Sequence, residues 1–167
     1  MLIAQATDAE TKGDIAEFLM EEVGPQSDTL LLLGPGSTVQ AIGDALSIDK
    51  TLLGIDAVRS ATMIGKDLNE NQILDLLDRY PRRKLILSPI GAQGFVLGRG
   101  NLQLSPEVIK RIGRESIIVV ATPAKLARTQ ALRFDTGDAT LDAELRGSGY
   151  IPVVIGYRLR RLVRAAD

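Results

Sequence analysis

The chain has 167 residues, of which 45% are hydrophobic and 25% are charged, with a formal net charge of −1. These values are typical of one globular domain that is large enough to bury a core. Cysteine and histidine are both absent, which excludes disulfides, thiolate nucleophiles, catalysis by imidazole and zinc sites built from Cys and His. Tryptophan is also absent and aromatic residues are only 4%, which argues against recognition of single-stranded nucleic acid by base stacking.

Targeting and membrane signals are missing from the sequence. The first residues have neither a basic start nor a long apolar stretch, and no apolar run approaches the ~18 residues of a membrane span. We therefore expect a single cytoplasmic domain that covers residues 1–167, without a membrane partner.

Charge is distributed unevenly along the chain. Residues 1–78 hold 14 acidic and 4 basic side chains, whereas residues 79–167 hold 7 acidic and 16 basic ones. Either the two halves attract each other or a neighbouring subunit, or the basic half lines a site for an anionic ligand. A homo-oligomer is therefore one possible assembly.

Apolar residues recur at strand or helix spacing along most of the chain. In the first half of the chain this pattern predicts strands at 3–6, 29–33 and 51–58, the last turning at 59–61 into 62–64, and helices at 8–22, 37–46 and 70–79. In the second half it predicts strands at 84–87, 116–121, 131–134, 150–156 and 158–163. The helices of that half are expected from 106, from 123 (a short one) and at 138–145. Alternation of this kind is typical of a three-layer α/β fold. We expect a mainly parallel sheet with helices on both faces and an antiparallel C-terminal edge.

The stretch at residues 30–38 is the most informative motif. Four leucines lead into Gly34, Pro35 and Gly36, and then Ser37 and Thr38 open a helical pattern. A buried strand that feeds a glycine turn at a helix N-terminus favours anion binding, because free backbone N–H groups and the helix dipole both attract negative charge. The alternative is a tight turn that binds nothing. The motif differs from the Gly-x-x-x-x-Gly-Lys-Ser/Thr phosphate loop, since no lysine follows the second glycine.

Three further groups of polar or glycine residues fall at the carboxyl ends of predicted strands. They are Asp56, the segment that contains Gly91, Gln93 and Gly94, and the segment that ends in Lys125. Ligands of open α/β sheets bind beyond the carboxyl ends of the strands, so we expect these groups to form one crevice with the turn at Gly34. Arg99 lies between two glycines and is a candidate bidentate partner for a phosphate or carboxylate. Simple hairpin geometry explains the same glycines equally well.

Two other charged segments have ordinary structural explanations beside functional ones. Asp138 is either the N-cap of a helix or, with Asp135, a magnesium ligand or general base. The arginines at 158, 160, 161 and 164 favour a charged edge strand over a nucleic-acid patch. We therefore expect no nucleic-acid partner.

Seven separated motifs together resemble a known family. They occupy residues 33–38, 50–56, 65–70, 88–95, 98–106, 119–126 and 135–138. In this order they resemble the C-terminal region of the archaeal and bacterial ATP-NAD kinase-like proteins, which include the acetoin-catabolism X protein. The resemblance covers nearly the whole chain.

The resemblance implies phosphoryl transfer from ATP to NAD, with ATP and Mg²⁺ as the cofactors of the intact proteins and no covalently bound group. Kinase activity in the family depends on a Gly-Gly-Asp-Gly-Thr loop in an N-terminal domain, and this sequence has no Gly-Gly pair. We therefore expect the catalytic domain to be absent or supplied by a separate chain, and no catalytic residue is assigned.

A shorter resemblance concerns the loop alone. Residues 33–38 are similar to the Gly-x-Gly-Ser-Thr loop of ribose-5-phosphate isomerase, and residues 119–126 are similar to a segment of sugar-responsive regulators of that fold. These likenesses imply that a phosphorylated small molecule or nucleotide binds at Gly34, Gly36, Ser37 and Thr38, with Asp56 on sugar hydroxyls and Lys125 and Arg99 on negative charge. A regulatory module and a sugar-phosphate isomerase-like domain stay open as alternatives.

Overall fold

The computed structural model describes residues 2–23, 28–98 and 100–167. In these ranges the strands form a seven-stranded sheet, in the order β3-β2-β1-β4-β6-β8-β9, and a separate sheet of β5 and β7. The strands are β1 (Leu30–Leu33), β2 (Asp56–Arg59), β3 (Thr62–Gly65), β4 (Arg83–Leu87), β5 (Phe95–Leu97), β6 (Ile117–Val120), β7 (Arg133–Phe134), β8 (Tyr150–Gly156) and β9 (Leu159–Arg164). The helices are α1 (Leu2–Glu22), α2 (Ser37–Ala45), α3 (Glu70–Arg79), α4 (Pro106–Ile112), α5 (Pro123–Ala127) and α6 (Ala139–Arg146), with a 3₁₀ turn at Arg114–Ser116.

The centre of the large sheet is parallel. Strands β1, β4, β6 and β8 run in one direction, whereas β2 and β3 at one edge and β9 at the other are antiparallel to their neighbours. The expected α/β class and the antiparallel C-terminal edge are both confirmed. The antiparallel direction of β2 was not expected. It places the first residue of that strand, Asp56, opposite Leu33 at the end of β1.

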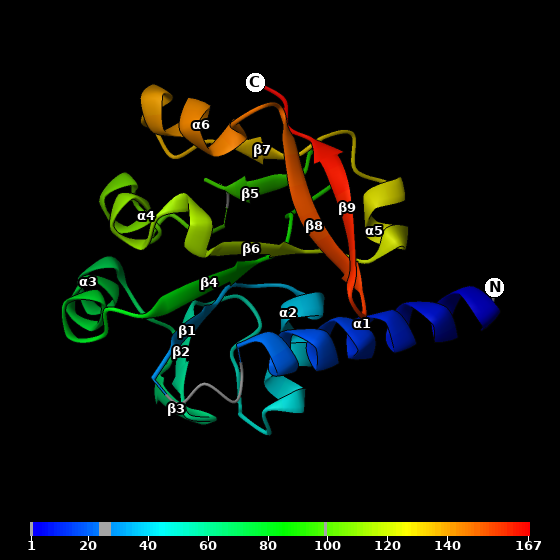
Figure 1. Cartoon of the computed structure of the whole chain (residues 1–167), viewed down its shortest axis with the longest axis horizontal. Helices are drawn as coiled ribbons and strands as arrows, with labels where there is room; N and C mark the ends of the chain where they lie inside the picture. Colours follow the sequence, from blue (N-terminus) through cyan, green and yellow to red (C-terminus); the bar gives the residue numbers. More distant parts are fainter. Residues whose placement is uncertain (1, 24–27, 99) are drawn as a thin grey trace.

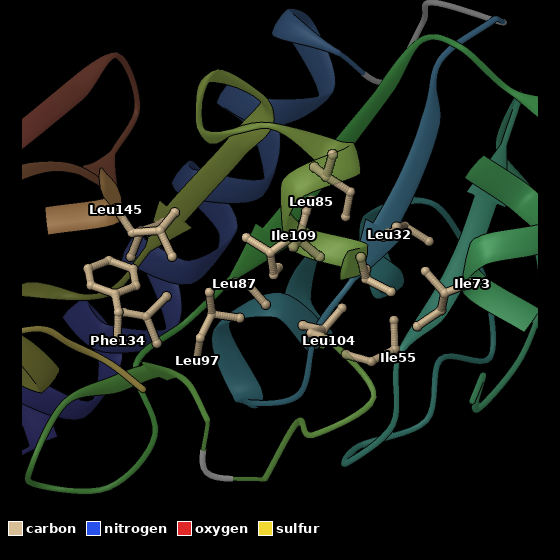
Figure 2. Packing of buried hydrophobic residues seen from close by; sticks show 14 of the residues in the cluster. Leu32, Ile55, Ile73, Leu85, Leu87, Leu97, Leu104, Ile109, Phe134 and Leu145 are labelled. Atoms are coloured by element: carbon tan, nitrogen blue, oxygen red, sulfur yellow. The ribbon is translucent and has the colours of Figure 1, made fainter. Parts of the chain in front are cut away.

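Alternate residues of the central strands contribute to two separate hydrophobic clusters. Leu30 and Leu32 of β1 face α3, α4, α6 and the small sheet, whereas Leu31 and Leu33 face α1 and α2. Figure 1 shows these two groups of helices on opposite sides of the large sheet, and Figure 2 shows the packing around Leu32, Leu85 and Leu87 in the first cluster. Burial on both faces explains why β1 consists entirely of leucine.

Residues 3–6 belong to helix α1 and not to a strand, so the expected first strand is wrong. Asp8, the first residue of the helix expected at 8–22, lies inside α1 and pairs with Lys12, with 3.2 Å between Oδ2 and Nζ. A four-residue segment such as 3–6 is too short for its apolar spacing to distinguish a strand from a helical turn. Here the helix pattern of residues 8–22 continues toward the N-terminus without a break.

Helix α1 packs against both α2 and the β8–β9 hairpin. The rings of Phe18 and Tyr157 meet edge to face with centroids 6.1 Å apart, and the Arg160 guanidinium lies 5.0 Å from the Phe18 ring. The Tyr157 hydroxyl donates to Glu21 at 2.7 Å. Because Ile15 and Leu19 are also buried, the C-terminal half of α1 is anchored in the core.

Two expected strands are shorter in the structure. Only residues 56–58 of the expected strand at 51–58 belong to β2, because residues 51–55 form a loop that hydrogen-bonds to the Asp56 carboxylate. Only Arg133–Phe134 of the expected strand at 131–134 is a strand, and it pairs with β5 instead of joining the large sheet.

The expected helix starts are confirmed at three places. Asn69 caps α3 with a reciprocal bond to Gln72, and Ser105 caps α4 before Pro106. Asp138 caps α6 by accepting from the Leu141 N–H. Side-chain acceptors at these positions satisfy N–H groups that a helix leaves free at its first turn.

None of the helices in the described ranges is both long enough and apolar enough to cross a membrane.

We expect Ile15→Ala to lower the free energy of unfolding by roughly 2–5 kcal/mol, because a fully buried side chain would leave a cavity between α1 and the sheet. Glu10→Ala on the exposed face of the same helix is the control and should leave the unfolding free energy nearly unchanged. Chemical denaturation monitored by circular dichroism measures both. Equal stability of the two variants would contradict the docking of α1.

Candidate functional site: a basic cavity at the start of helix α2

The turn between β1 and α2 requires glycine at two positions. A Cβ on Gly34 would lie 2.7 Å from Leu87 Cδ2 and 3.1 Å from the Ile86 carbonyl oxygen, so any larger residue would collide with β4. Gly36 has φ +113°, a conformation that side-chain-bearing residues rarely adopt. Its N–H donates to the Leu52 carbonyl at 3.2 Å, which ties the turn to the loop before β2.

The N-terminus of α2 has no side-chain cap. Gly36 occupies the N-cap position of this nine-residue helix and has no side chain to offer. The first N–H groups of a helix have no partner within the helix, and the dipole adds partial positive charge there. The turn therefore directs unpaired donors from Ser37 and Thr38 outward, which is the local geometry of an anion site.

A cavity of about 490 Å³ opens at this helix end, a volume within the usual range for small-molecule sites. Its described walls come from the first half of α1, the β1–α2 turn, the loops after β4 and before β2, and α5. The lining residues are Asp8, Lys12, Pro35, Gly36, Ser37, Thr38, Leu53, Ser88, Pro89, Ile90, Gly91, Gly100, Thr122, Lys125 and Arg128. The elements lie around the carboxyl ends of the parallel strands, as Figure 1 shows, so the position agrees with the rule for open α/β sheets.

Positive charge predominates on the described walls of the cavity. Lys12, Lys125 and Arg128 contribute three cations, against the single carboxylate of Asp8. Thr122 is buried, and its hydroxyl accepts from the Lys125 N–H at 3.2 Å. This bond caps the start of α5 and fixes the backbone position of Lys125. Leu53 and Ile90 add apolar surface. The arrangement is suited to a small molecule that carries both negative charge and an apolar or sugar part.

The sequence model of the ATP-NAD kinase C-terminal domain matches residues 26–165. This chain belongs to the ATP-NAD kinase C-terminal domain family. The match agrees with the seven motifs and includes every lining residue except Asp8 and Lys12 on α1. Comparison with curated proteins and with solved structures found no match.

Five of the site residues expected from the sequence line the cavity of this kinase-family domain. They are Gly36, Ser37, Thr38, Gly91 and Lys125. Gly34 belongs to the same turn but packs against β4, so it does not line the cavity. Arg99 lies outside the described residues.

Gln93 and Gly94 are not among the residues that line the cavity. The loop closes on itself through bonds between Ile90 and Phe95, with Ile90 N donating to Phe95 O at 2.8 Å. A Cβ on Gly94 would lie 2.1 Å from the Ala131 carbonyl oxygen, so this glycine permits close packing of two chain segments. Gln93 is exposed.

Asp56 is fully buried and does not line the cavity. Its carboxylate accepts from the Thr51 N–H at 2.8 Å, from the Thr51 hydroxyl at 2.9 Å and from the Asp67 N–H at 2.8 Å. The Lys50 ammonium lies 3.8 Å away and donates to the Thr51 carbonyl at 2.6 Å. Asp56 therefore joins the two loops that flank β2 and β3, behind the wall that carries Leu53.

The buried ammonium of Lys50 is disfavoured by its surroundings. Burial lowers its pKa from the ordinary lysine value, and the attraction of Asp56 only partly opposes this effect. Two charges buried together depend on each other, since removal of one leaves the other without compensation.

Asp138 is a helix N-cap, which was one of the two interpretations of this residue. It caps α6 and accepts from the Lys110 ammonium at 2.7 Å. This bond is the main reason why the pKa of Asp138 is lowered and that of Lys110 is raised. In the described parts of the chain, no group of three or more Asp and Glu side chains is placed to hold a metal ion.

Sequence reasoning missed the contributions of Asp8, Lys12 and Arg128. Arg128 follows Lys125 by three residues, the spacing of neighbours on a helix surface, so the basic pair at α5 could have been recognised. Asp8 and Lys12 join the site only because α1 crosses the carboxyl edge of the sheet, and no local pattern encodes that contact.

We expect Asp56→Asn to lower the free energy of unfolding by roughly 3–5 kcal/mol, because Lys50 would stay buried without a counter-charge. Asp49→Asn removes the partner of Lys66 in an exposed ion pair and serves as the matched control, which should change stability little. The double variant Lys50→Met with Asp56→Asn should recover much of the loss. Urea denaturation distinguishes these outcomes, and equal effects of the two single changes would contradict the structural role of the buried pair.

Proposed function

We propose that this domain binds a phosphorylated small molecule, a nucleotide or a sugar phosphate, with a phosphate at the N-terminus of α2. The observation that carries the proposal is the uncapped start of α2 facing a cavity with Lys12, Lys125 and Arg128 on its walls. N–H donors and cations that converge on one enclosed space match the negative charge and acceptor oxygens of a phosphate.

Membership of the ATP-NAD kinase family supports a ligand of this class. ATP and NAD, which the resemblance implies as substrates of the intact proteins, both carry phosphates on a ribose. The Gly-Gly-Asp-Gly-Thr loop on which transfer depends is not in these 167 residues. We therefore assign to this chain the binding and orientation of the phosphorylated ligand. We assign the phosphoryl transfer to intact kinases of the family, in which a domain with that loop is present beside this one.

Each group of the cavity has a distinct part in this proposal. The N–H groups at Ser37 and Thr38 hold the phosphate oxygens, and the rigid turn at Gly36 keeps these donors in place before the ligand arrives. Lys125 and Arg128, at α5, neutralise the remaining charge. Leu53 and Ile90 exclude water from the less polar part of the ligand and strengthen the charged contacts.

The residues present do not fit a magnesium ion held by this chain alone. Asp8 is the single carboxylate on the described walls of the cavity, and it is already paired with Lys12. Mg²⁺ in phosphate-transfer sites is commonly bound by one or two carboxylates together with substrate phosphates. No step of the proposed binding is therefore assigned to a metal.

A regulatory module that binds a sugar phosphate without turnover is the second candidate. It is favoured by the same absence of the Gly-Gly-Asp-Gly-Thr loop from the sequence. The two candidates differ in the ligand, since a kinase domain should prefer NAD or ATP and a sensor should prefer a sugar phosphate.

Isothermal titration calorimetry with ribose 5-phosphate, NAD, NADP and ATP, each with and without Mg²⁺, tests the proposal. We expect at least one of these ligands to bind the wild-type chain. Lys125→Gln and Arg128→Gln should each weaken that binding about tenfold or more, because each removes a charge-assisted contact to the phosphate.

Arg161→Gln is the control for the loss of charge, because Arg161 is exposed on β9 and does not line the cavity. This variant should bind like the wild type. Failure of all four ligands to bind would overturn the proposal, as would equal weakening in the control and the cavity variants.

A further inference from the structure

Asp8 is an unexpected residue in a cavity that attracts anions. It is the one carboxylate on the described walls, and it faces the same space as three cations and an uncapped helix start. A negative charge in this place repels a phosphate. The residue therefore weakens anion binding unless the ligand also presents hydrogen-bond donors to it.

The pair formed by Asp8 and Lys12 differs from an ordinary surface pair. The chain offers a pair of the same i to i+4 spacing for comparison, formed by Asp75 and Arg79 on α3. The side chains of Asp8 and Lys12 are 31% and 27% exposed, whereas those of Asp75 and Arg79 on α3 are 64% and 62% exposed. The pair on α1 is thus about half as exposed as its counterpart, because it stands at the wall of the cavity.

The position of the pair on α1 is not a consequence of core packing at the same turns. Among residues 8–22 of α1, the first buried side chains are Ile15, Ala16, Phe18 and Leu19, and none of residues 8–14 is buried. The turns of α1 that pack in the core thus carry Asp8 and Lys12, which are not buried, to the wall of the cavity. In Figure 1 this part of α1 and α5 extend on the same side of the molecule.

The family match begins at residue 26, so this wall lies outside the part of the chain that the ATP-NAD kinase C-terminal domain model covers. The turn at Gly36 and the cations of α5 lie inside it. The start of α2 and the cations of α5 therefore lie in the matched region, and the carboxylate end of the cavity belongs to the segment that precedes that region in this chain.

We infer that Asp8 accepts hydrogen bonds from the sugar hydroxyls of the phosphorylated ligand and so sets a preference for a polyhydroxylated phosphate ester over inorganic phosphate. An ionised carboxylate only accepts hydrogen bonds and has about four acceptor sites, so the contact to Lys12 leaves capacity for hydroxyl donors. Lys12 compensates the charge of Asp8 and orients it. This inference rests on the proposed function, because it assumes that a phosphate binds at α2.

The test measures two ligands on one variant. Inorganic phosphate reports on the phosphate end of the cavity alone, and ribose 5-phosphate adds the hydroxyls. We expect Asp8→Asn to weaken ribose 5-phosphate about tenfold, because a charge-assisted contact is lost. The same variant should bind inorganic phosphate as tightly as the wild type or more tightly, since a repulsive charge has been removed.

Asp75→Asn breaks the matched pair on α3, far from the described cavity walls, and should change neither affinity. If Asp8→Asn strengthens both ligands or leaves both unchanged, the hydroxyl contact is contradicted while the proposed function stands. If the wild-type chain binds neither ligand, the proposed function fails and this inference fails with it.

Discussion

The buried carboxylate of Asp56 is the interaction on which the geometry of the cavity depends. It holds the backbone at Thr51 and Asp67 through direct hydrogen bonds, and Lys50 compensates its charge. The loop fixed in this way presents the Leu52 carbonyl to the Gly36 N–H. One enclosed charge therefore connects the antiparallel edge of the sheet to the turn that starts α2, and it does so without facing the ligand space itself.

The uneven distribution of charge along the chain has two structural consequences. Ion pairs join the acidic and basic halves, as between Asp78 and Arg111 and between Glu21 and Arg158. The basic half also supplies Lys125 and Arg128 to the cavity. The two explanations that composition left open are thus compatible, because different basic residues form the ion pairs and line the cavity.

Much of the fold could be predicted because burial imposes simple patterns. A strand covered on both faces must be apolar throughout, and the leucines of β1 follow that rule. The cap at Asn69 was recognisable because its chemistry is local. Residues 51–55 were misassigned because the side chain of Asp56 competes with the sheet for their backbone donors, a contact that apolar spacing cannot reveal.

The site divides in the same way. The turn at Gly34 and Gly36 is recognisable in the sequence itself, since glycine is required there for steric and conformational reasons. Asp8 and Lys12 reach the cavity only through the path of α1, so a tertiary contact was needed to find them. Asp56 was expected at the end of a strand and in the crevice, but it is the first residue of the antiparallel β2 and is buried behind the cavity. The bonds of its oxygens to Thr51 and Asp67 follow only from the folded structure.

A titration of the ¹⁵N-labelled chain with inorganic phosphate, followed by amide chemical shifts, tests the central claim most directly. A phosphate at the start of α2 polarises the nearest N–H groups, so we expect the largest shifts at Ser37 and Thr38, with smaller ones at Gly36. Largest shifts along the arginine-rich strand β9, or none at the start of α2, would contradict a phosphate site at this helix.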